Sequence, residues 1–204
     1  PERAAAVIRG VTAQGADALD IGLSTTPMFN FAVASEQGRD AGIMVSASHN
    51  PAKYNGFKID YHDGIPVSGI TGLPEVANLV AAGNFPTATV PGVVEEVSGV
   101  LEQYLDRVTS FIDPAALPPV RMVVDCGNGM GGLTMPHLAP LLHGEVTSLF
   151  WELDGSFPTH EANPIKPENV RDLADAVRDA GAAVGFAYDG DADRLGVVDE
   201  RGEL

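Results

Sequence analysis

The chain has 204 residues, and 45% of them are hydrophobic, a share that supports a globular core in one large or two small domains. Asp and Glu number 28 against 12 Lys and Arg, so the formal net charge is −16. This balance argues against nucleic acid and anionic membranes as partners, because both bind cationic surfaces. An anionic substrate would require local positive charge from a metal ion or from a few placed Arg, Lys and His side chains.

One cysteine, Cys126, is present, so no intrachain disulfide forms, as expected in a reducing compartment. The sequence has no apolar run long enough to span a bilayer, and its first ten residues, PERAAAVIRG, do not resemble a signal peptide. We therefore expect a cytoplasmic protein. The pattern gives no indication of the oligomeric state.

Hydrophobic periodicity predicts helices that alternate with strands along the chain. In chain order, the first set has a helix over 1–14, a strand over 19–23, a helix from Thr26, strands over 43–45 and 54–60, and helices over 73–82 and 97–112. Thr26 is the expected N-cap of its helix, and Pro27 follows at the first helical position. The 97–112 helix is supported by apolar residues at i, i+3, i+4 and i+7.

The segment DPAALPP, residues 113–119, separates this set from a second one. Its prolines cannot continue a helix, so we interpret it as a linker between domains at 1–112 and 120–204. The second set has strands over 120–124, 146–151, 182–188 and 195–198, and helices over 132–142 and around Val170, Leu173, Ala174 and Val177. This alternation predicts two α/β domains.

The stretch AYDGDADRLGVVDE, residues 187–200, places three carboxylates at i, i+2 and i+4. In an extended chain this spacing points Asp189, Asp191 and Asp193 to one side. Three like charges on one face repel each other unless a cation lies among them, and Mg²⁺ and Ca²⁺ prefer such oxygen ligands. The stretch also follows a hydrophobic strand, at the end where ligands of α/β sheets bind.

Four interpretations of this stretch are open on the residues alone. The simplest is a solvated acidic turn. An EF-hand loop would match Glu200 at position 12, but Arg194 stands where that loop has Gly, and the flanks are predicted strands. A third is an aspartyl-phosphate phosphotransferase with Asp189 or Asp191 as nucleophile. In the fourth, the carboxylates hold Mg²⁺ beside a phosphate that another segment carries.

The segment GIMVSASHNPAKYNGFK, residues 42–58, supplies a candidate for that other segment. A hydrophobic strand ends at a small polar cluster in which His49 and Asn50 follow Ser48. Such a cluster presents a serine nucleophile, or it is an ordinary turn in which the serine caps a helix. Ser46 is a rival nucleophile two residues earlier.

The motifs SASHNP, YNGFK and DGDADR, in this order and at this separation, resemble those of the phosphohexomutases, the phosphomannomutase and phosphoglucomutase family. The resemblance runs over the whole chain but covers only about the first half of the family's four-domain architecture. It implies two consecutive three-layer α/β domains with mixed sheets, the first incomplete at its N-terminus.

The resemblance also implies the roles of the site residues. Ser48 matches the phosphoserine that gives its phosphoryl group to a hexose phosphate, mannose and/or glucose, through a bisphosphate intermediate. The Mg²⁺ ligands are Asp189, Asp191 and Asp193, with phosphorylated Ser48, and a glucose 1,6-bisphosphate-type activator loads the serine. The remaining catalytic residues are His49, Lys58 and Arg194.

The family's sugar- and phosphate-recognition domains lie outside this sequence, so we expect the 204-residue chain alone to be nearly inactive. Two alternatives stay open. One is a phosphatase or phosphotransferase that uses Asp191 as nucleophile; the other is a non-catalytic metal-binding fragment.

Two further segments are rich in turn-forming residues. GNGMGG, residues 127–132, matches the G-x-G-x-x-G dinucleotide fingerprint, with Glu152 at the appropriate distance. Such glycines also serve any tight strand-to-helix turn, and we favour that interpretation. In DGSFPTHEANP, residues 154–164, we interpret His160, Glu161 and Asn163 as residues that fix a long loop.

Overall fold

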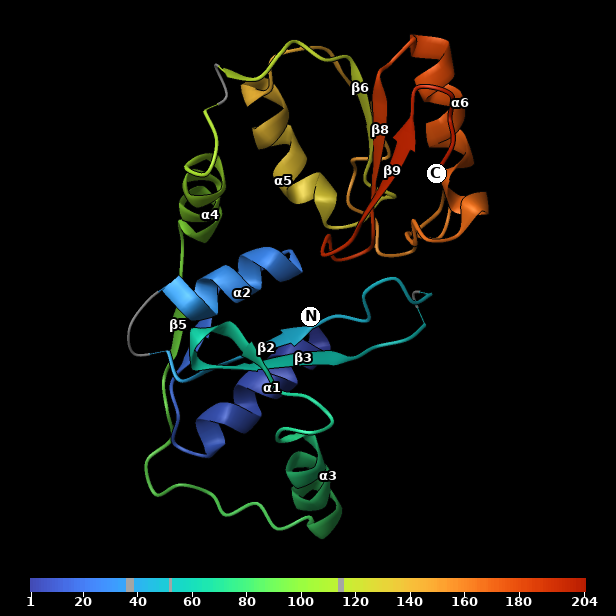
Figure 1. The fold of residues 1–204 in the computed structure, drawn as a ribbon. Coiled ribbons are helices and arrows are strands. Elements are labelled where there is room, and N and C mark those ends of the chain that lie inside the picture. Colours follow the sequence, from blue (N-terminus) through green and yellow to red (C-terminus); the bar gives the residue numbers. More distant parts are fainter. Residues whose placement is uncertain (36–38, 52, 114–115) are drawn as a thin grey trace. The chain divides into compact units, whose positions relative to one another are not determined.

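The computed structural model describes residues 1–35, 39–51, 53–113 and 116–204 (Figure 1). They form two compact units. Unit 1 comprises Pro1–Leu23, Phe29–Ser46 and Gly56–Val100, and unit 2 comprises Ser24–Met28, Ala47–Asn55 and Leu101–Leu204. Among the described residues, no helix is both long and apolar enough to cross a membrane.

Unit 1 contains two small sheets and three helices. A parallel pair joins β1 to β5, and an antiparallel sheet has the order β2-β3-β4. The strands are β1 (Ala18–Asp20), β2 (Ala41–Val45), β3 (Phe57–Tyr61), β4 (Ile65–Pro66) and β5 (Val94–Glu96), and the helices are α1 (Glu2–Ala13), most of α2 (Thr26–Ser35) and α3 (Leu73–Ala82). A short 3₁₀ helix covers His62–Gly64.

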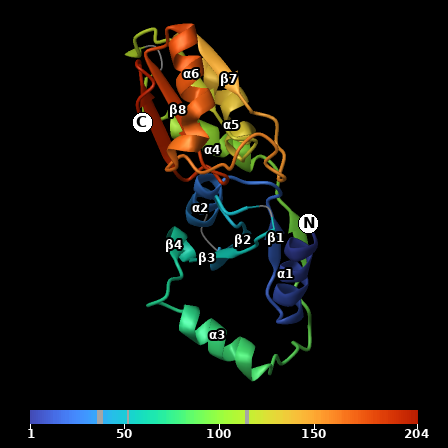
Figure 2. The same cartoon turned by 90° about the vertical axis from the view of Figure 1, so that its right-hand side faces the viewer.

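Unit 2 is built on one mixed sheet of order β7-β6-β8-β9. β6 is parallel to β7 and β8, whereas β8 and β9 are antiparallel. Its elements are α4 (Val100–Thr109), β6 (Met122–Asp125), α5 (Gly131–Leu138), β7 (Val146–Leu149), α6 (Arg171–Ala180), β8 (Val184–Tyr188) and β9 (Leu195–Asp199), with 3₁₀ helices at Ala139–Leu141 and Pro167–Val170. Figures 1 and 2 show α5 and α6 on opposite faces of this sheet.

The alternation of side chains along β8 explains why helices cover both faces. Gly185 and Ala187 face α6, and a Cβ on Gly185 would lie 2.7 Å from Val177 and 2.8 Å from Leu173. Phe186 on the opposite face joins the core of Met135 and β6. Small residues thus bring α6 close, while large ones fill the α5 side.

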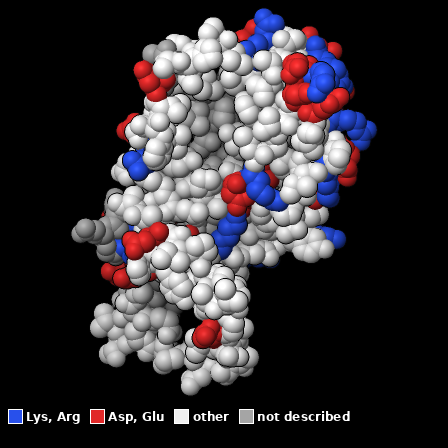
Figure 3. All heavy atoms as spheres, viewed as in Figure 1, with Lys and Arg blue, Asp and Glu red and all other residues white. Residues whose placement is uncertain are grey.

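The surface of unit 2 differs over the two helices. Figure 3 shows Lys, Arg, Asp and Glu atoms gathered where α6 lies, and a stretch without these residue types over α5. Asp175 and Arg178 of α6 form an ion pair, as do Asp199 at the end of β9 and Arg201. On the face seen in Figure 3, the charged residues of unit 2 therefore gather over α6 and not over α5.

The fold class is confirmed: the chain has two α/β parts, with a mixed sheet in unit 2. The 73–82 helix has the predicted bounds, whereas the 97–112 helix runs only from Val100 to Thr109. Gly99 has a φ of 82°, which a right-handed helix cannot include, and Phe111 and Ile112 continue with i→i+3 hydrogen bonds. The linker over 113–119 stays a prediction, and its residues 114 and 115 lie outside the described residues.

Candidate active site

The loop after β2 presents Ser48. The amide of Asn50 donates to the carbonyl of Ala47 at 3.1 Å and closes a tight turn. Ser48 lies within this turn at a φ of 53°, in the left-handed region that a non-glycine residue rarely adopts. Such a conformation costs on the order of 1 kcal/mol and persists where the surrounding structure imposes it, often at functional sites.

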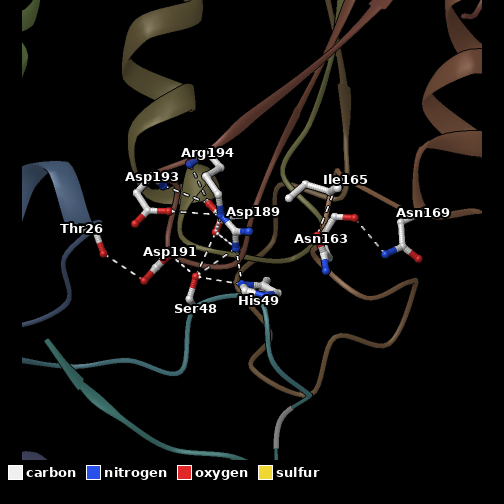
Figure 4. A network of polar contacts seen from close by, with 10 residues as sticks. All are labelled: Thr26, Ser48, His49, Asn163, Ile165, Asn169, Asp189, Asp191, Asp193 and Arg194. Carbon is white, nitrogen blue, oxygen red and sulfur yellow. Dashed lines mark hydrogen bonds and ion pairs between the residues drawn. The ribbon is translucent and has the colours of Figure 1, made fainter. Parts of the chain in front are cut away.

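Two buried carboxylates surround the Ser48 hydroxyl (Figure 4). Its Oγ lies 3.0 Å from Asp189 Oδ2 and 3.0 Å from Asp191 Oδ1. These two residues are 0% and 2% exposed, respectively. A hydroxyl has one proton and donates to one acceptor at a time, so the serine alone cannot satisfy both carboxylates.

The carboxylates come from the turn between β8 and β9, residues 189–194, which we name the carboxylate loop. The Asp189 Oδ1 atom accepts hydrogen bonds from the amides of Asp193 and Arg194, each at 3.0 Å. Ala192 has a left-handed φ of 60°. The carboxylate oxygens of Asp189, Asp191 and Asp193 lie within 4.8 Å of one another. A folded turn gathers them, so the extended-chain explanation of their spacing was wrong.

Arg194 brings a cationic side chain to this cluster. Its Nη2 lies 2.7 Å from Asp189 Oδ2, and its Nε lies 3.6 Å from Asp193 Oδ1. Burial raises the pKa of Asp189 above its usual value; the Arg194 hydrogen bonds oppose that rise, and the charges of Asp191 and Asp193 add to it. The Arg194 guanidinium thus contacts Asp189 and Asp193, and two of the three carboxylates of the cluster are buried. This all-oxygen donor set fits a hard divalent cation such as Mg²⁺.

His49 and Ser48 also face Arg194. The Nη2 of Arg194 lies 3.3 Å from Ser48 Oγ and contacts His49 Nδ1. Because a guanidinium only donates hydrogen bonds, Nδ1 acts as the acceptor in this contact. His49 Nδ1 also lies 3.3 Å from Ser48 Oγ. The structure thus brings together six of the seven predicted site residues, Ser48, His49, Asp189, Asp191, Asp193 and Arg194, all within unit 2.

Lys58 is the seventh predicted residue. It lies in β3 of unit 1, where it pairs in register with Met44 of β2. Its role at the site stays a prediction. Ser46, the rival nucleophile, also belongs to unit 1, where its amide donates to the carbonyl of Gly56 at 3.1 Å.

Thr26 is a contact residue that the sequence did not indicate. Its Oγ1 donates to Asp191 Oδ2 at 2.9 Å, and its amide donates to the Asp191 carbonyl at 2.9 Å. The expected capping role falls instead to Thr25, whose Oγ1 accepts from the amide of Met28 at 3.1 Å. The prediction of Thr26 as the N-cap was therefore wrong by one residue. Local spacing could not show that the Thr26 side chain bonds to a residue 165 positions away.

Strands β8 and β9 flank the carboxylate loop, so the EF-hand interpretation, which requires helices, is wrong.

In the GNGMGG turn, a Cβ on Gly129 would lie 2.9 Å from the Gly190 carbonyl oxygen, and one on Gly132 would lie 2.0 Å from that of Trp151. Close backbone approach accounts for these glycines without a dinucleotide.

Asn163 stabilises the 154–164 loop. Its carbonyl accepts from Asn169 Nδ2 at 3.0 Å, and its Oδ1 accepts from the amide of Ile165 at 3.4 Å (Figure 4).

Cys126 is fully buried, and burial followed by the Asp125 charge raises its thiol pKa. A thiol that stays protonated is a poor nucleophile, which leaves Ser48 as the better candidate.

Comparison with known proteins identifies the family of the chain. Residues 1–85 match the model of phosphoglucomutase/phosphomannomutase α/β/α domain I, and residues 102–202 match that of domain II. A phosphoglucomutase of Neisseria gonorrhoeae is 40% identical over 206 residues, which cover 100% of this chain and 43% of that protein. A phosphomannomutase/phosphoglucomutase of Pseudomonas putida is 38% identical, with 97% and 41% covered.

A solved structure shares the fold as well. The phosphoglucomutase/phosphomannomutase family protein of Burkholderia thailandensis matches with a TM-score of 0.88 and 35% identity, over 100% of this chain and 44% of that one. The chain therefore spans less than half the length of the relatives it matches. With both domain models matched in order, it belongs to the phosphoglucomutase/phosphomannomutase family and carries that family's domains I and II.

Proposed function

We propose that the intact protein is a phosphohexomutase that interconverts hexose 6-phosphate and hexose 1-phosphate, of mannose and/or glucose, with Ser48 as the phosphoryl carrier. One observation carries the proposal. The Ser48 hydroxyl, in a left-handed turn, lies 3.0 Å from two buried carboxylates and 3.3 Å from an arginine. Family membership supports the same reaction.

In the forward step, the bond between the phosphorus and Ser48 Oγ breaks as a sugar hydroxyl oxygen bonds to phosphorus. The hydroxyl proton is released and Ser48 regains a proton, which leaves a hexose bisphosphate. The bisphosphate turns, and Ser48 Oγ takes the other phosphoryl group in the reverse sequence. Phosphoryl transfer depends mainly on alignment and charge stabilisation, which a fixed Oγ and a nearby guanidinium provide.

Charge balance explains why a cation belongs in this proposal. The three carboxylates carry the same sign of charge as a phosphoserine dianion at Ser48 and would repel it without a cation among them. Asp189, Asp191 and Asp193, with an oxygen of phosphorylated Ser48, would hold the Mg²⁺. When bound, the cation neutralises charge on the phosphoryl oxygens and lowers the barrier to transfer.

The remaining predicted residues complete the proposal. Arg194 holds the phosphoryl group through Nη2, which already faces Ser48 Oγ at 3.3 Å. His49 lies beside the same oxygen and orients the guanidinium. Lys58 is proposed as the group near the reacting sugar hydroxyl.

An aspartyl-phosphate enzyme that uses Asp191 is the competing proposal. Asp191 Oδ2 accepts from Thr26 Oγ1, and its Oδ1 lies 3.0 Å from Ser48 Oγ. A carboxylate nucleophile needs an oxygen that faces the phosphorus, so these contacts favour Ser48.

The test is to incubate the chain with glucose 1,6-bisphosphate and Mg²⁺ and to locate the phosphoryl group by peptide mass spectrometry. We expect one phosphoryl group on Ser48, its loss in Ser48→Ala, and its retention in the matched control Ser46→Ala. A label that survives Ser48→Ala but disappears in Asp191→Asn would establish the aspartyl alternative. Metal binding without any label, also in the full-length protein, would leave only a metal-binding module.

Mutase turnover is measured alongside. We propose that the 204-residue chain is phosphorylated at Ser48 but turns over hexose phosphate poorly. Much of the rate depends on binding the distal phosphate of the bisphosphate while it turns, and the domains that recognise sugar and phosphate lie outside this sequence. Robust turnover by this chain would contradict that part alone.

A further inference from the structure

A buried pair, Asp125 and His160, joins the two turn-rich segments that the proposed reaction does not use. His160 Nε2 lies 3.1 Å from Asp125 Oδ2, and the two side chains are 15% and 1% exposed. Asp125 ends β6 and leads into the GNGMGG turn, whereas His160 lies in the 154–164 loop. The contact therefore crosses between segments 35 residues apart.

The hydrogen bonds of His160 indicate an imidazolium. Its Nδ1 lies 3.0 Å from the carbonyl oxygen of Glu161, which only accepts, and its Nε2 faces a carboxylate. Both ring nitrogens therefore donate, which requires the charged form. The Asp125 hydrogen bond is the main cause of a raised His160 pKa, against the effect of burial. Asp125 Oδ1 also accepts from the amide of Gly127 at 2.7 Å.

Both segments hold the same residue of the carboxylate loop. The amide of Gly190 donates to the carbonyl of Ala162 at 3.1 Å, and the carbonyl of Gly190 accepts from the amide of Met130 at 2.9 Å. Gly190 is buried and stands between Asp189 and Asp191 in the chain. One peptide segment of the loop is thus fixed from two directions.

Two features restrict the movement of the turn against the 154–164 loop. A Cβ on Gly127 would lie 3.2 Å from the Ala162 Cβ and 3.3 Å from His160 Cε1. Gly127 and Asn128 have φ values of 52° and 58°, so the turn that carries Met130 has two consecutive left-handed residues. A turn of this kind needs a fixed anchor, and Asp125 supplies one at its start.

We propose that Asp125 and His160 are positioning residues that keep the carboxylate loop in its cation-binding geometry. The pair connects the turn at 127–130 to the loop at 160–162. The turn then binds the carbonyl of Gly190 through Met130, and the loop binds its amide through Ala162. Loss of the pair would let the two segments move separately and would carry Asp189 and Asp191 out of place. This inference rests on the proposed function in one respect, that the loop binds a divalent cation.

The test uses the 204-residue chain and two readouts. Mn²⁺ affinity is measured by electron paramagnetic resonance, and amide hydrogen exchange of the metal-free chain is followed in peptides that cover 187–194. The variants are His160→Ala and Asp125→Asn, with His160→Gln as the conservative rescue, since its amide can still donate to Asp125. The matched control is His137→Ala, an exposed histidine of α5 in the same unit.

We expect His160→Ala and Asp125→Asn to weaken Mn²⁺ binding about tenfold, the usual effect of losing a residue that orients metal ligands. Exchange in 187–194 should rise more than elsewhere in unit 2, with partial recovery in His160→Gln and none of these changes in His137→Ala. Unchanged affinity with unchanged local exchange would overturn the proposal, as would faster exchange spread evenly over unit 2.

Failure of the proposed function has a different signature. If the wild-type chain binds no Mn²⁺, the metal role of the three aspartates is wrong. The exchange measurement then decides the positioning role by itself, because it is made without metal.

Discussion

The two units bury their apolar side chains differently. In unit 2, α6 buries Leu173, Ala174 and Val177 against the sheet, and a second buried cluster fills the α5 side. In unit 1, α2 buries Phe29, Ala32 and Val33, whereas neither α1 nor α3 has a buried residue. Leu79 and Val80 of α3 are 60% and 64% exposed.

This difference indicates where stability resides. Burial of apolar surface contributes about 25 cal/mol per Å², so the two clusters packed against the sheet stabilise unit 2 directly. The Ser48 turn and the carboxylate loop belong to unit 2. The candidate site therefore depends on the better packed part of the chain.

The largest effect is expected for Leu173→Ala. Leu173 is 0% exposed and packs close to Gly185, so its truncation leaves a cavity. We expect the free energy of unfolding of unit 2 to fall by about 3 kcal/mol. Urea unfolding followed by the fluorescence of Trp151, the one tryptophan of the sequence, reports on this unit. A loss below about 1 kcal/mol, the range of ordinary surface substitutions, would contradict the packing described for α6.

The next effect concerns the loops of the site. In Gly190→Ala the new Cβ would lie 2.3 Å from the Ser48 carbonyl oxygen, so the Ser48 turn and the carboxylate loop could not keep their contact. We expect a loss of about 1–3 kcal/mol, as for other overpacked sites, together with reduced phosphorylation of Ser48. Gly155→Ala is the control, because nothing lies within 4 Å of its Cβ position. Equal stability and labelling in the two variants would disagree with the described approach.

The sequence was sufficient to predict elements with strong local signals. The 73–82 helix matches because it begins with a proline in its first turn and ends at Gly83 in the left-handed region, both local features. Strand β5 (Val94–Glu96) was missed because three residues carry too little periodicity, and its pairing with β1 is not local.

The candidate site also combines residues with a local sequence signal and residues whose contacts are not local. The three aspartates and the serine stand in compact motifs, and resemblance to a family placed them together. The pairs Thr26–Asp191 and Asp125–His160 join residues 165 and 35 positions apart, with no local spacing that would indicate them. Their contacts follow from strand order and loop course, which the tertiary fold determines.

A smaller effect is expected from pH. The pKa of His160 is raised above 6.5, chiefly by its hydrogen bond to Asp125 and also by the charges of Asp125 and Asp172. A group whose folded-state pKa is raised stabilises the fold fully below its unfolded pKa, and the contribution is lost as pH rises through the folded pKa. The stability difference between wild type and His160→Gln should therefore be larger at pH 6 than at pH 9, measured from Trp151 fluorescence in urea. A difference that grows with pH would mean that His160 is neutral in the fold.

The smallest effect is expected in α3 of unit 1. Leu79→Ala removes an apolar side chain that is 60% exposed, from a helix with no buried residue. Alanine and leucine both favour helices, so we expect the stability to change by less than about 0.5 kcal/mol. The measurement pairs Trp151 fluorescence for unit 2 with hydrogen exchange over 73–82 for α3. If this exposed leucine proved as costly to remove as Leu173, the face of α3 would have to be covered in solution, and the contrast between the two units would no longer describe the molecule. If it does not, the same chemical change, leucine to alanine, separates α6 of the unit that holds the site from α3 of unit 1, which buries no residue.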